Sequence, residues 1–265
     1  IDSIPSEEIS LKIKKNDFYY YSKIKSDEQY PVYFREKDNK VEEILNVNKL
    51  GKDLDYYQIS GVSPSPNNNI IAYGEDKNGR REYTVKFKDL RSDSLLIDEL
   101  QNTSGNISWG NDEYIYYTLK DPKTLISNKV FRHKLGESQK DDFLIYEELD
   151  DQFNLSISKS RTDRYIFINS SKTESNEIWM IDLENILEEP KCLLERSDKH
   201  LYYVEDTPES FYALSNKNDR INFCLLKFFV SLIYLFYMRC IFLHFVLFHL
   251  GLHILWIFQQ IVFYI

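Results

Sequence analysis

Short runs of alternating apolar and polar residues, separated by clusters of turn-forming residues, dominate the first 220 positions of the chain. In the clearest run, 82–90, Tyr83, Val85 and Phe87 fall on one face of an extended strand, because successive side chains point to opposite sides. An earlier turn, 65–69, combines one proline with three asparagines, which favour tight reversals. The pattern therefore predicts an all-β fold of short strands joined by turns.

This arrangement of strands and turns recurs along the chain after a predicted hairpin at 18–34. Strands are expected at 58–63, 70–74, 82–90 and 95–97, then at 107–109, 114–118, 129–135 and 143–146, then at 155–158, 165–170 and 177–183, and finally at 201–204 and 211–215. The first turns of successive blocks are separated by roughly 45 to 50 residues, which is the period of a four-stranded propeller blade. A partial β-propeller of about four blades is favoured over a β-sandwich of about nine strands, because the turns repeat in order as well as in number.

The composition changes abruptly near Arg220, since the chain contains no acidic residue from there to its last position. Residues 240–258 are apolar and long enough for a membrane helix, but the three histidines among them would be costly in a bilayer. Translation from a shifted frame or an intron also explains such a composition. We therefore expect a partial propeller at 1–222 and an apolar tail at 223–265, which is either frameshift- or intron-derived or a transmembrane helix.

Charge and cysteine content restrict the function and the compartment. The net charge of -9 argues against a nucleic-acid-binding protein, which needs clustered basic residues. Cys192, Cys224 and Cys240 are widely spaced and odd in number, so we expect no disulfide framework and a cytoplasmic location, or a membrane location if the tail is genuine. His249 and His253 would share a helix face, but no acidic residue lies near them to complete a metal site. No metal or cofactor is expected.

Six stretches carry a more specific signal. They read YYYSKIKSDEQYPVYFREKD (from Tyr19), EEILNVNKL, SPSPNNNIIAYGEDKNGRREYTVKFKDL, NTSGNISWGNDEYIYYT, KVFRHKLGE and SKSRTDRYIFINSSKTESNEIWMIDL. In these stretches, in their order and spacing, the segment from about 2 to 222 resembles the N-terminal propeller of oligopeptidase B, in the prolyl oligopeptidase family of serine peptidases. The resemblance implies a seven-bladed propeller that covers an α/β-hydrolase domain. In that domain a Ser, an Asp and a His cleave short peptides after Lys or Arg, and the propeller restricts the entry of large folded substrates.

The catalytic part of such an enzyme is not recognisable in this sequence. A hydrolase nucleophile needs a G-x-S-x-G elbow, and none of the 8 glycines makes that pattern. The segment 105–110 has glycines at the wrong spacing around Ser108 and is expected to be a turn that enters a strand. We therefore predict no catalytic, cofactor-binding or metal-binding residue in this chain.

The sequence predicts a fragment of a serine-type oligopeptidase that contributes substrate gating and is inactive alone. Its expected partners are short peptides, in the intact enzyme, and the hydrolase domain; nucleic acid is not expected, and a membrane only if the tail is genuine. One alternative is a membrane-tethered partial propeller that binds partners without enzymatic activity. Another is a product that fails to fold and aggregates through exposed strand edges and apolar faces.

Individual residues that could suggest other chemistry have structural interpretations. Aromatic side chains within strands, Trp109 and Trp179, are expected in the core. His133 and His200 are expected to be solvated or packed between strands, because no nucleophile accompanies them. The acidic pairs are expected on a solvated face rather than as paired glycosidase carboxylates; they are Glu147, Glu148, Asp150 and Asp151.

Overall fold

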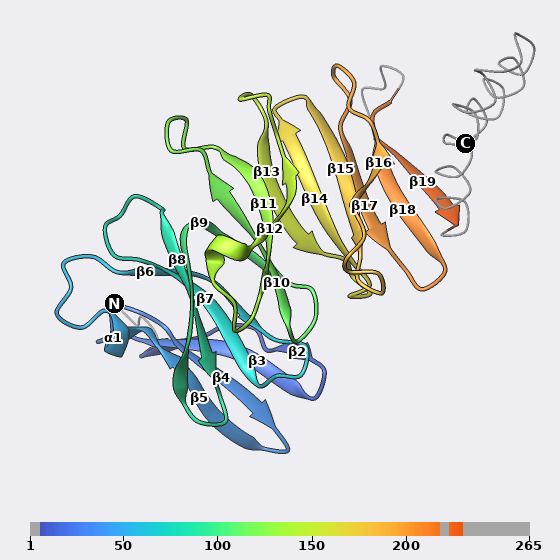
Figure 1. The fold of residues 1–265 in the computed structure, drawn as a ribbon. Helices are drawn as coiled ribbons and strands as arrows, with labels where there is room; N and C mark the ends of the chain where they lie inside the picture. The colour runs from blue at the N-terminus through green and yellow to red at the C-terminus, as the bar shows by residue number, and fades with distance from the viewer. Residues whose placement is uncertain (1–5, 218–222, 230–265) are drawn as a thin grey trace, which may run out of the picture. The chain divides into compact units, whose positions relative to one another are not determined.

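A computed structural model describes residues 6–217 and 223–229 of the chain (Figure 1). The described residues form two compact units, which divide between Ser158 and Lys159. Within the described ranges, β-strands dominate, and helical structure is limited to α1 (Val47–Leu50) and the 3-10 turn η1 (Gln139–Asp141). The prediction of an all-β fold is therefore confirmed.

The first sheet contains the predicted hairpin at 18–34. Its strands are β1 (Glu7–Ile9), β2 (Ile13–Lys15), β3 (Phe18–Lys25), β4 (Val32–Lys37) and β5 (Lys40–Asn46). The order is β1-β3-β4-β5, and β2 also pairs with β3. Tyr21 lies opposite Phe34 across the hairpin, and the two rings stack with their centroids 5.6 Å apart. Cross-strand aromatic pairs of this kind fix the register of a hairpin.

A seven-stranded antiparallel sheet joins two of the predicted four-stranded blocks. Its strands are β6 (Gln58–Pro64), β7 (Ile70–Asp76), β8 (Tyr83–Asp89), β9 (Ser94–Trp109), β10 (Tyr114–Lys120), β11 (Ser127–Lys134) and β12 (Phe143–Glu147), and they lie in sequence order across the sheet. The first half of β9 pairs with β8 and the second half with β10. Each half therefore completes one four-stranded group.

The expected separate strands at 95–97 and 107–109 are in fact the two halves of β9. Thr103 marks the point of transfer, because it lies opposite Tyr83 of β8 and also opposite Leu119 of β10. Asn102 and Gly105 on either side of it have φ values of 58° and 82°. Positive φ at these two positions twists the strand without ending it, which explains why turn-type residues did not mark a strand boundary here.

The core of the seven-stranded sheet contains Trp109, as predicted. The Trp109 side chain is 3% exposed, and its Nε1 donates a hydrogen bond to the Ser63 carbonyl at 3.1 Å. Its ring meets the Phe87 ring edge-on at a centroid distance of 6.0 Å. The indole therefore combines a large buried apolar surface with a satisfied polar atom.

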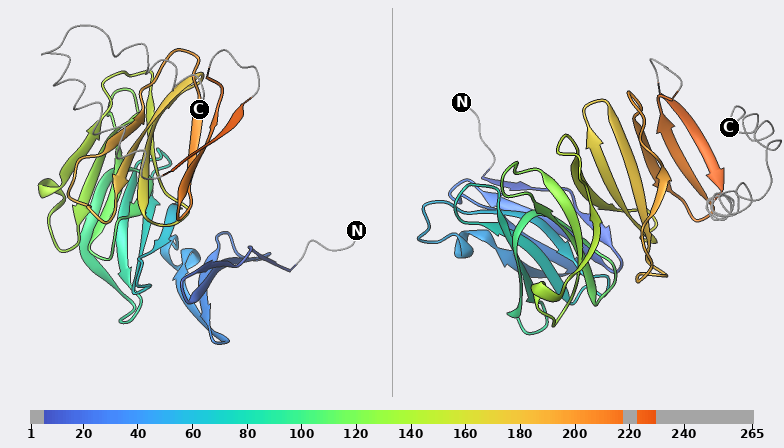
Figure 2. Two further views of the ribbon diagram at one scale, coloured as in Figure 1. Left: turned by 90° about the vertical axis from the view of Figure 1, so that its right-hand side faces the viewer. Right: turned by 45° about the horizontal axis from the view of Figure 1, so that its top comes forward.

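The second unit contains two sheets that pack against one another (Figures 1 and 2). One contains β14 (Tyr165–Lys172), β15 (Ser175–Asp182) and β16 (Lys191–Leu194), and β13 (Asn154–Lys159), at the boundary between the units, completes it in the order β13-β14-β15-β16. The other contains β17 (Tyr202–Asp206), β18 (Ser210–Ser215) and β19 (Cys224–Phe229). Their shared apolar core includes Phe167, Met180, Tyr202 and Phe211. Alternation along the strands places these side chains on the facing sides.

The sheet β17-β18-β19 of the second unit continues past the predicted boundary at residue 222. Strand β19 pairs with β18 from Cys224 opposite Ser215 to Phe229 opposite Ser210. The first residues of the apolar tail are therefore part of a β-sheet. Residues 230–265, including the predicted membrane helix at 240–258, lie outside the described residues. Among residues 6–217 and 223–229, no helix is long and apolar enough to span a membrane.

Candidate functional site

The segment 105–110, whose glycines and serine most resemble a nucleophile elbow, begins within a paired β-strand. Gly105 lies within β9, and a Cβ atom placed on it would come 2.3 Å from Ser60 Oγ and 2.8 Å from the Tyr83 ring. Ser108 is buried, and it lies opposite Tyr116 in a regular antiparallel ladder. An elbow needs an exposed serine on a sharp turn between a strand and a helix, so this segment cannot supply one.

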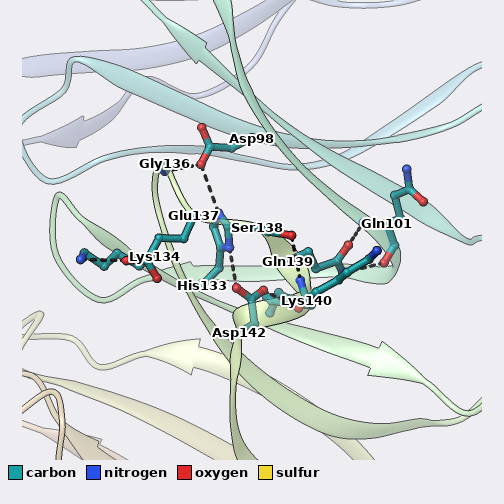
Figure 3. Close-up of polar contacts among 11 residues, drawn as sticks. Asp98, Gln101, His133, Lys134, Gly136, Glu137, Ser138, Gln139, Lys140 and Asp142 are labelled. Carbon is teal, nitrogen blue, oxygen red and sulfur yellow. Dashed lines mark hydrogen bonds and ion pairs between the residues drawn. The ribbon is translucent and has the colours of Figure 1, made fainter.

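A cluster of buried titratable groups surrounds His133 of β11 (Figure 3). The imidazole is 1% exposed and lies between two carboxylates. Its Nδ1 is 2.7 Å from Asp142 Oδ1, and its Nε2 is 3.3 Å from Asp98 Oδ1. Asp98 is on β9, whereas Asp142 directly follows η1 in the connection from β11 to β12. The cluster thus joins a strand to a loop that lies far from it in sequence.

Further hydrogen bonds hold both carboxylates in place. The Gly136 N–H donates to Asp98 Oδ1, and the Tyr117 hydroxyl donates to Asp142 Oδ2 at 2.7 Å. Burial, followed by the hydrogen bond to Asp142, raises the pKa of the Tyr117 phenol, which therefore remains a protonated donor. Gln139 of η1 and Gln101 of β9 also exchange two hydrogen bonds through the Gln139 side-chain amide (Figure 3).

This cluster is not suited to proton transfer with a substrate. Both ring nitrogens of His133 are already hydrogen-bonded to carboxylates, and the ring face stacks on Phe87 at a centroid distance of 6.1 Å. A general base needs a free nitrogen within reach of the substrate proton, and a nucleophile must lie beside it. Of the two predicted environments for His133, packing between strands is therefore correct and solvation is wrong, because two buried carboxylates stabilise the ring inside the protein.

A second buried histidine contacts a serine without forming a catalytic pair. His200 is 3% exposed, and its Nε2 is 2.9 Å from the hydroxyl of buried Ser215. Within the part of the chain that the structure describes, His200 Nδ1 has no hydrogen-bond partner, so no carboxylate orients the ring as in a Ser-His-Asp triad. Burial, followed by the charge of Lys217, lowers the pKa of His200 and keeps the ring neutral.

Two other predictions need correction. Trp179 is only partly buried on β15, where its Nε1 donates to Glu177 Oε1 at 3.0 Å, so it does not belong to the central core as expected. Glu148 was expected on a solvated face but is 4% exposed, because its Oε1 accepts the Asp150 N–H at 3.0 Å and closes the loop after β12. Neither residue had a sequence pattern that distinguished it from its neighbours.

Metal and thiol chemistry find little support in the described residues. Residues 6–217 and 223–229 contain no group of three His, Cys, Asp or Glu side chains that could hold a metal ion. Cys192 and Cys224 are free thiols. Burial, followed by the charge of Glu177, raises the pKa of Cys192 to about 12, which disfavours the reactive thiolate.

Successive antiparallel sheets built from four-stranded groups are the architecture of a β-propeller domain. The family described as "Prolyl oligopeptidase, N-terminal beta-propeller domain" matches residues 1–231, and the chain belongs to this family. The resemblance noted in the sequence is thereby confirmed, and the partial propeller is favoured over the sandwich.

Relatives of this chain are peptidases by name. "Protease 2" of Moraxella lacunata is 33% identical over 238 residues, which are 86% of this chain and 34% of that protein. "Dipeptidyl aminopeptidase BI" of Pseudoxanthomonas mexicana is 34% identical over 194 residues, or 66% of this chain and 27% of that protein. The solved structure of oligopeptidase B from Leishmania major matches with a TM-score of 0.80 and 26% identity, over 84% of this chain and 33% of that one. The chain thus spans about a third of the length of these relatives.

Proposed function

We propose that this chain is the substrate-gating propeller portion of an oligopeptidase B-type serine peptidase. The observation that carries the proposal is the match of residues 1–231 to the N-terminal propeller domain of the prolyl oligopeptidase family. In the proposed enzyme, an α/β-hydrolase domain supplies the Ser, Asp and His that cleave short peptides after Lys or Arg. This portion contributes no catalytic group.

The structure suggests how such a portion would act on substrate selection. Within the first unit, side-chain bonds tie one sheet to the next, for example between the Tyr20 hydroxyl of β3 and Asn68 Oδ1 in the turn between β6 and β7, at 2.7 Å. A barrier built from hydrogen-bonded sheets resists deformation by a large folded substrate, whereas a short extended peptide can pass. The net charge of -9 would also favour the approach of peptides that carry Lys or Arg.

We further propose that the protein works in the cytoplasm. The support is the small number of widely spaced cysteines, of which Cys192 and Cys224 are unpaired. Cell fractionation with an antibody against the chain tests this location. Recovery of the chain in the membrane fraction after a high-salt wash would instead favour the tethered binding module.

A domain exchange tests the gating function. The corresponding segment of full-length Moraxella lacunata Protease 2 would be replaced by residues 1–231 of this chain, the range that matches the family. Hydrolysis of a short Arg-ended chromogenic peptide would be compared with hydrolysis of a large folded protein. We expect the chimera to cleave the short peptide much faster than the large folded protein. The purified chain alone should hydrolyse neither substrate.

Two outcomes would contradict the proposal. A folded chimera that cleaves the large folded protein as readily as the short peptide would show that this propeller portion does not gate access. Turnover by the chain alone that survives repurification would show that it contains catalytic groups of its own. A deletion variant of Protease 2 that lacks the exchanged segment serves as the ungated reference.

A further inference from the structure

The hydrogen-bonding requirements around His133 determine which form of the imidazole fits the site. A neutral imidazole has a single N–H and could donate to Asp142 or to Asp98, but not to both. The other nitrogen would then present a lone pair to a carboxylate oxygen in a site that water scarcely reaches, since His133 is 1% exposed. An imidazolium donates from both nitrogens and neutralises one of the two negative charges.

We propose that His133 is a charged imidazolium and that the Asp98–His133–Asp142 triad is a pH-operated latch, which fastens the connection between β11 and β12 to strand β9. The argument rests on the two contacts of the ring, at 2.7 Å to Asp142 and 3.3 Å to Asp98, and on the side-chain exposures of His133, Asp98 and Asp142, which are 1%, 5% and 2%. Buried groups of opposite charge with all hydrogen bonds satisfied form a strong local constraint, and removal of the cation leaves two carboxylates uncompensated.

The two carboxylates of the latch attach both ends of the segment 135–142 to neighbouring strands. Asp98 Oδ1 receives the Gly136 N–H as well as His133 Nε2, so one carboxylate oxygen holds both the ring and the beginning of the loop. Asp142 holds the end of the same loop and also accepts the Tyr117 hydroxyl of β10. Loss of the imidazolium would therefore weaken the attachment of the whole segment 135–142. Because Asp98 lies in the half of β9 that pairs with β8, and the segment 135–142 follows β11, the latch links the two four-stranded groups.

The surroundings of His133 account for the pH range in which the latch stays closed. Burial opposes the charge, but the hydrogen bonds and charges of Asp142 and Asp98 outweigh it and raise the pKa of His133 above its ordinary value of 6.5. From β8 the ring faces uncharged Phe87. The adjacent cations of β11 have other partners: Lys134 pairs with Glu137, and Arg132 lies over the Tyr114 ring.

The direction of the pH effect follows from this shift. A histidine whose pKa is raised on folding contributes stability that is fully present below its unfolded pKa and is lost as pH rises through the folded pKa. The latch should therefore be closed on the acidic side of the folded pKa of His133 and open on its alkaline side. Acidic switching, the usual behaviour of a histidine whose charge disrupts packing, is the opposite of this expectation.

Side-chain NMR of the full 265-residue chain tests the proposal directly. Long-range proton–nitrogen spectra distinguish imidazolium from either neutral tautomer, and a pH titration follows each histidine. The His133→Gln variant assigns the signals. We expect His133 to be doubly protonated at neutral pH, and we expect Asp142→Asn to weaken its proton affinity by about tenfold or more. His200, which is buried without a carboxylate partner among the described residues, is the internal control and should be unaffected by Asp142→Asn.

Hydrogen exchange supplies a second readout that needs no substitution. Corrected for intrinsic base catalysis, protection of the Gly136 amide should fall by roughly tenfold as pH rises through the His133 titration, because its acceptor Asp98 becomes free to move. The Tyr202 amide, which donates to the Asn176 side chain at 2.9 Å, should not respond. A neutral His133 at neutral pH, or Gly136 protection that does not change as His133 titrates, would overturn the proposal.

Discussion

The carboxylate of Asp206, the last residue of β17, binds Thr162, which lies 44 residues earlier in the turn between β13 and β14. Asp206 Oδ1 accepts the Thr162 N–H at 3.0 Å, and Oδ2 accepts the Thr162 hydroxyl. In the first unit, Asp112 Oδ1 accepts the Asn67 N–H at 2.8 Å across a separation of 45 residues. In both cases an aspartate of one repeat holds the first turn of the preceding repeat.

Replacement of Asp206 should therefore destabilise the second unit. Asp206 is fully buried, and its Oδ2 is also 3.5 Å from the guanidinium of Arg164. Asp206→Ala leaves the backbone N–H and the hydroxyl of Thr162 without their acceptor and removes the negative charge beside Arg164. We expect a loss of about 3 kcal/mol in the free energy of unfolding. Urea denaturation followed by circular dichroism measures this loss.

Asp112→Ala is the matched control for that experiment, because Asp112 makes the corresponding contact from an exposed position. Water can replace its carboxylate, so the shift in the urea midpoint should be much smaller than for Asp206→Ala. Equal shifts for the two variants would mean that burial does not determine the strength of this contact.

Gly105 should tolerate no side chain. Its φ of 82° is left-handed, and an added Cβ would meet Ser60 Oγ at 2.3 Å and the Tyr83 ring at 2.8 Å. Gly136 is the matched control, since its φ of 87° is similar but no atom lies within 4 Å of the added Cβ. We expect Gly136→Ala to lower the free energy of unfolding by about 1 kcal/mol through backbone strain alone. Gly105→Ala should lower it by about 3 kcal/mol, because the packing between strands must also shift. Similar unfolding free energies for the two variants would refute the packing argument.

The strands that sequence reasoning located correctly are those with strong alternation. The segment 82–90 predicted β8 (Tyr83–Asp89) because Tyr83, Val85 and Phe87 bury one face, and all three are indeed in the interior. Short strands with little apolar content, such as β2 (Ile13–Lys15), were not predicted, because no residue of that strand is buried and pairing with β3 alone stabilises it. Periodicity detects burial, so strands without a buried face escape it.

The buried polar groups could not be predicted in the same way. The sequence around His133, with Arg132 and Lys134 on either side, is typical of a solvated strand, and only the fold brings Asp98 and Asp142 to its two nitrogens. Those carboxylates lie 35 positions before and 9 positions after it. A pairing across such separations leaves no local signal. The absence of a nucleophile elbow, by contrast, could be read from the sequence, because the residues of that motif are consecutive.

Stability of the second unit should fall as pH decreases below 6.5, because of His200. Burial lowers the pKa of His200 on folding, so the unfolded chain binds a proton before the folded one does. This contribution to stability is fully present above the ordinary pKa of 6.5 and is lost as pH falls through the depressed folded value. Unfolding of the wild-type chain and of His200→Gln, measured between neutral and mildly acidic pH, should show a pH dependence that the variant reduces. An unchanged dependence in the variant would assign it to other groups.

An uncovered row of apolar side chains on the last sheet should make the isolated chain self-associate. Tyr203, Leu214 and Leu225 lie opposite one another across β17, β18 and β19, and they are 57%, 45% and 66% exposed. Contiguous exposed apolar surface promotes association, whereas a single exposed residue rarely does. The double variant Leu214→Lys/Leu225→Lys should therefore lower the light scattering of concentrated protein several-fold. Leu149→Lys is the control, because Leu149 is 88% exposed in the loop after β12 and lies outside the row. If Leu149→Lys reduced scattering as much as the double variant, added charge rather than loss of the apolar row would explain the effect.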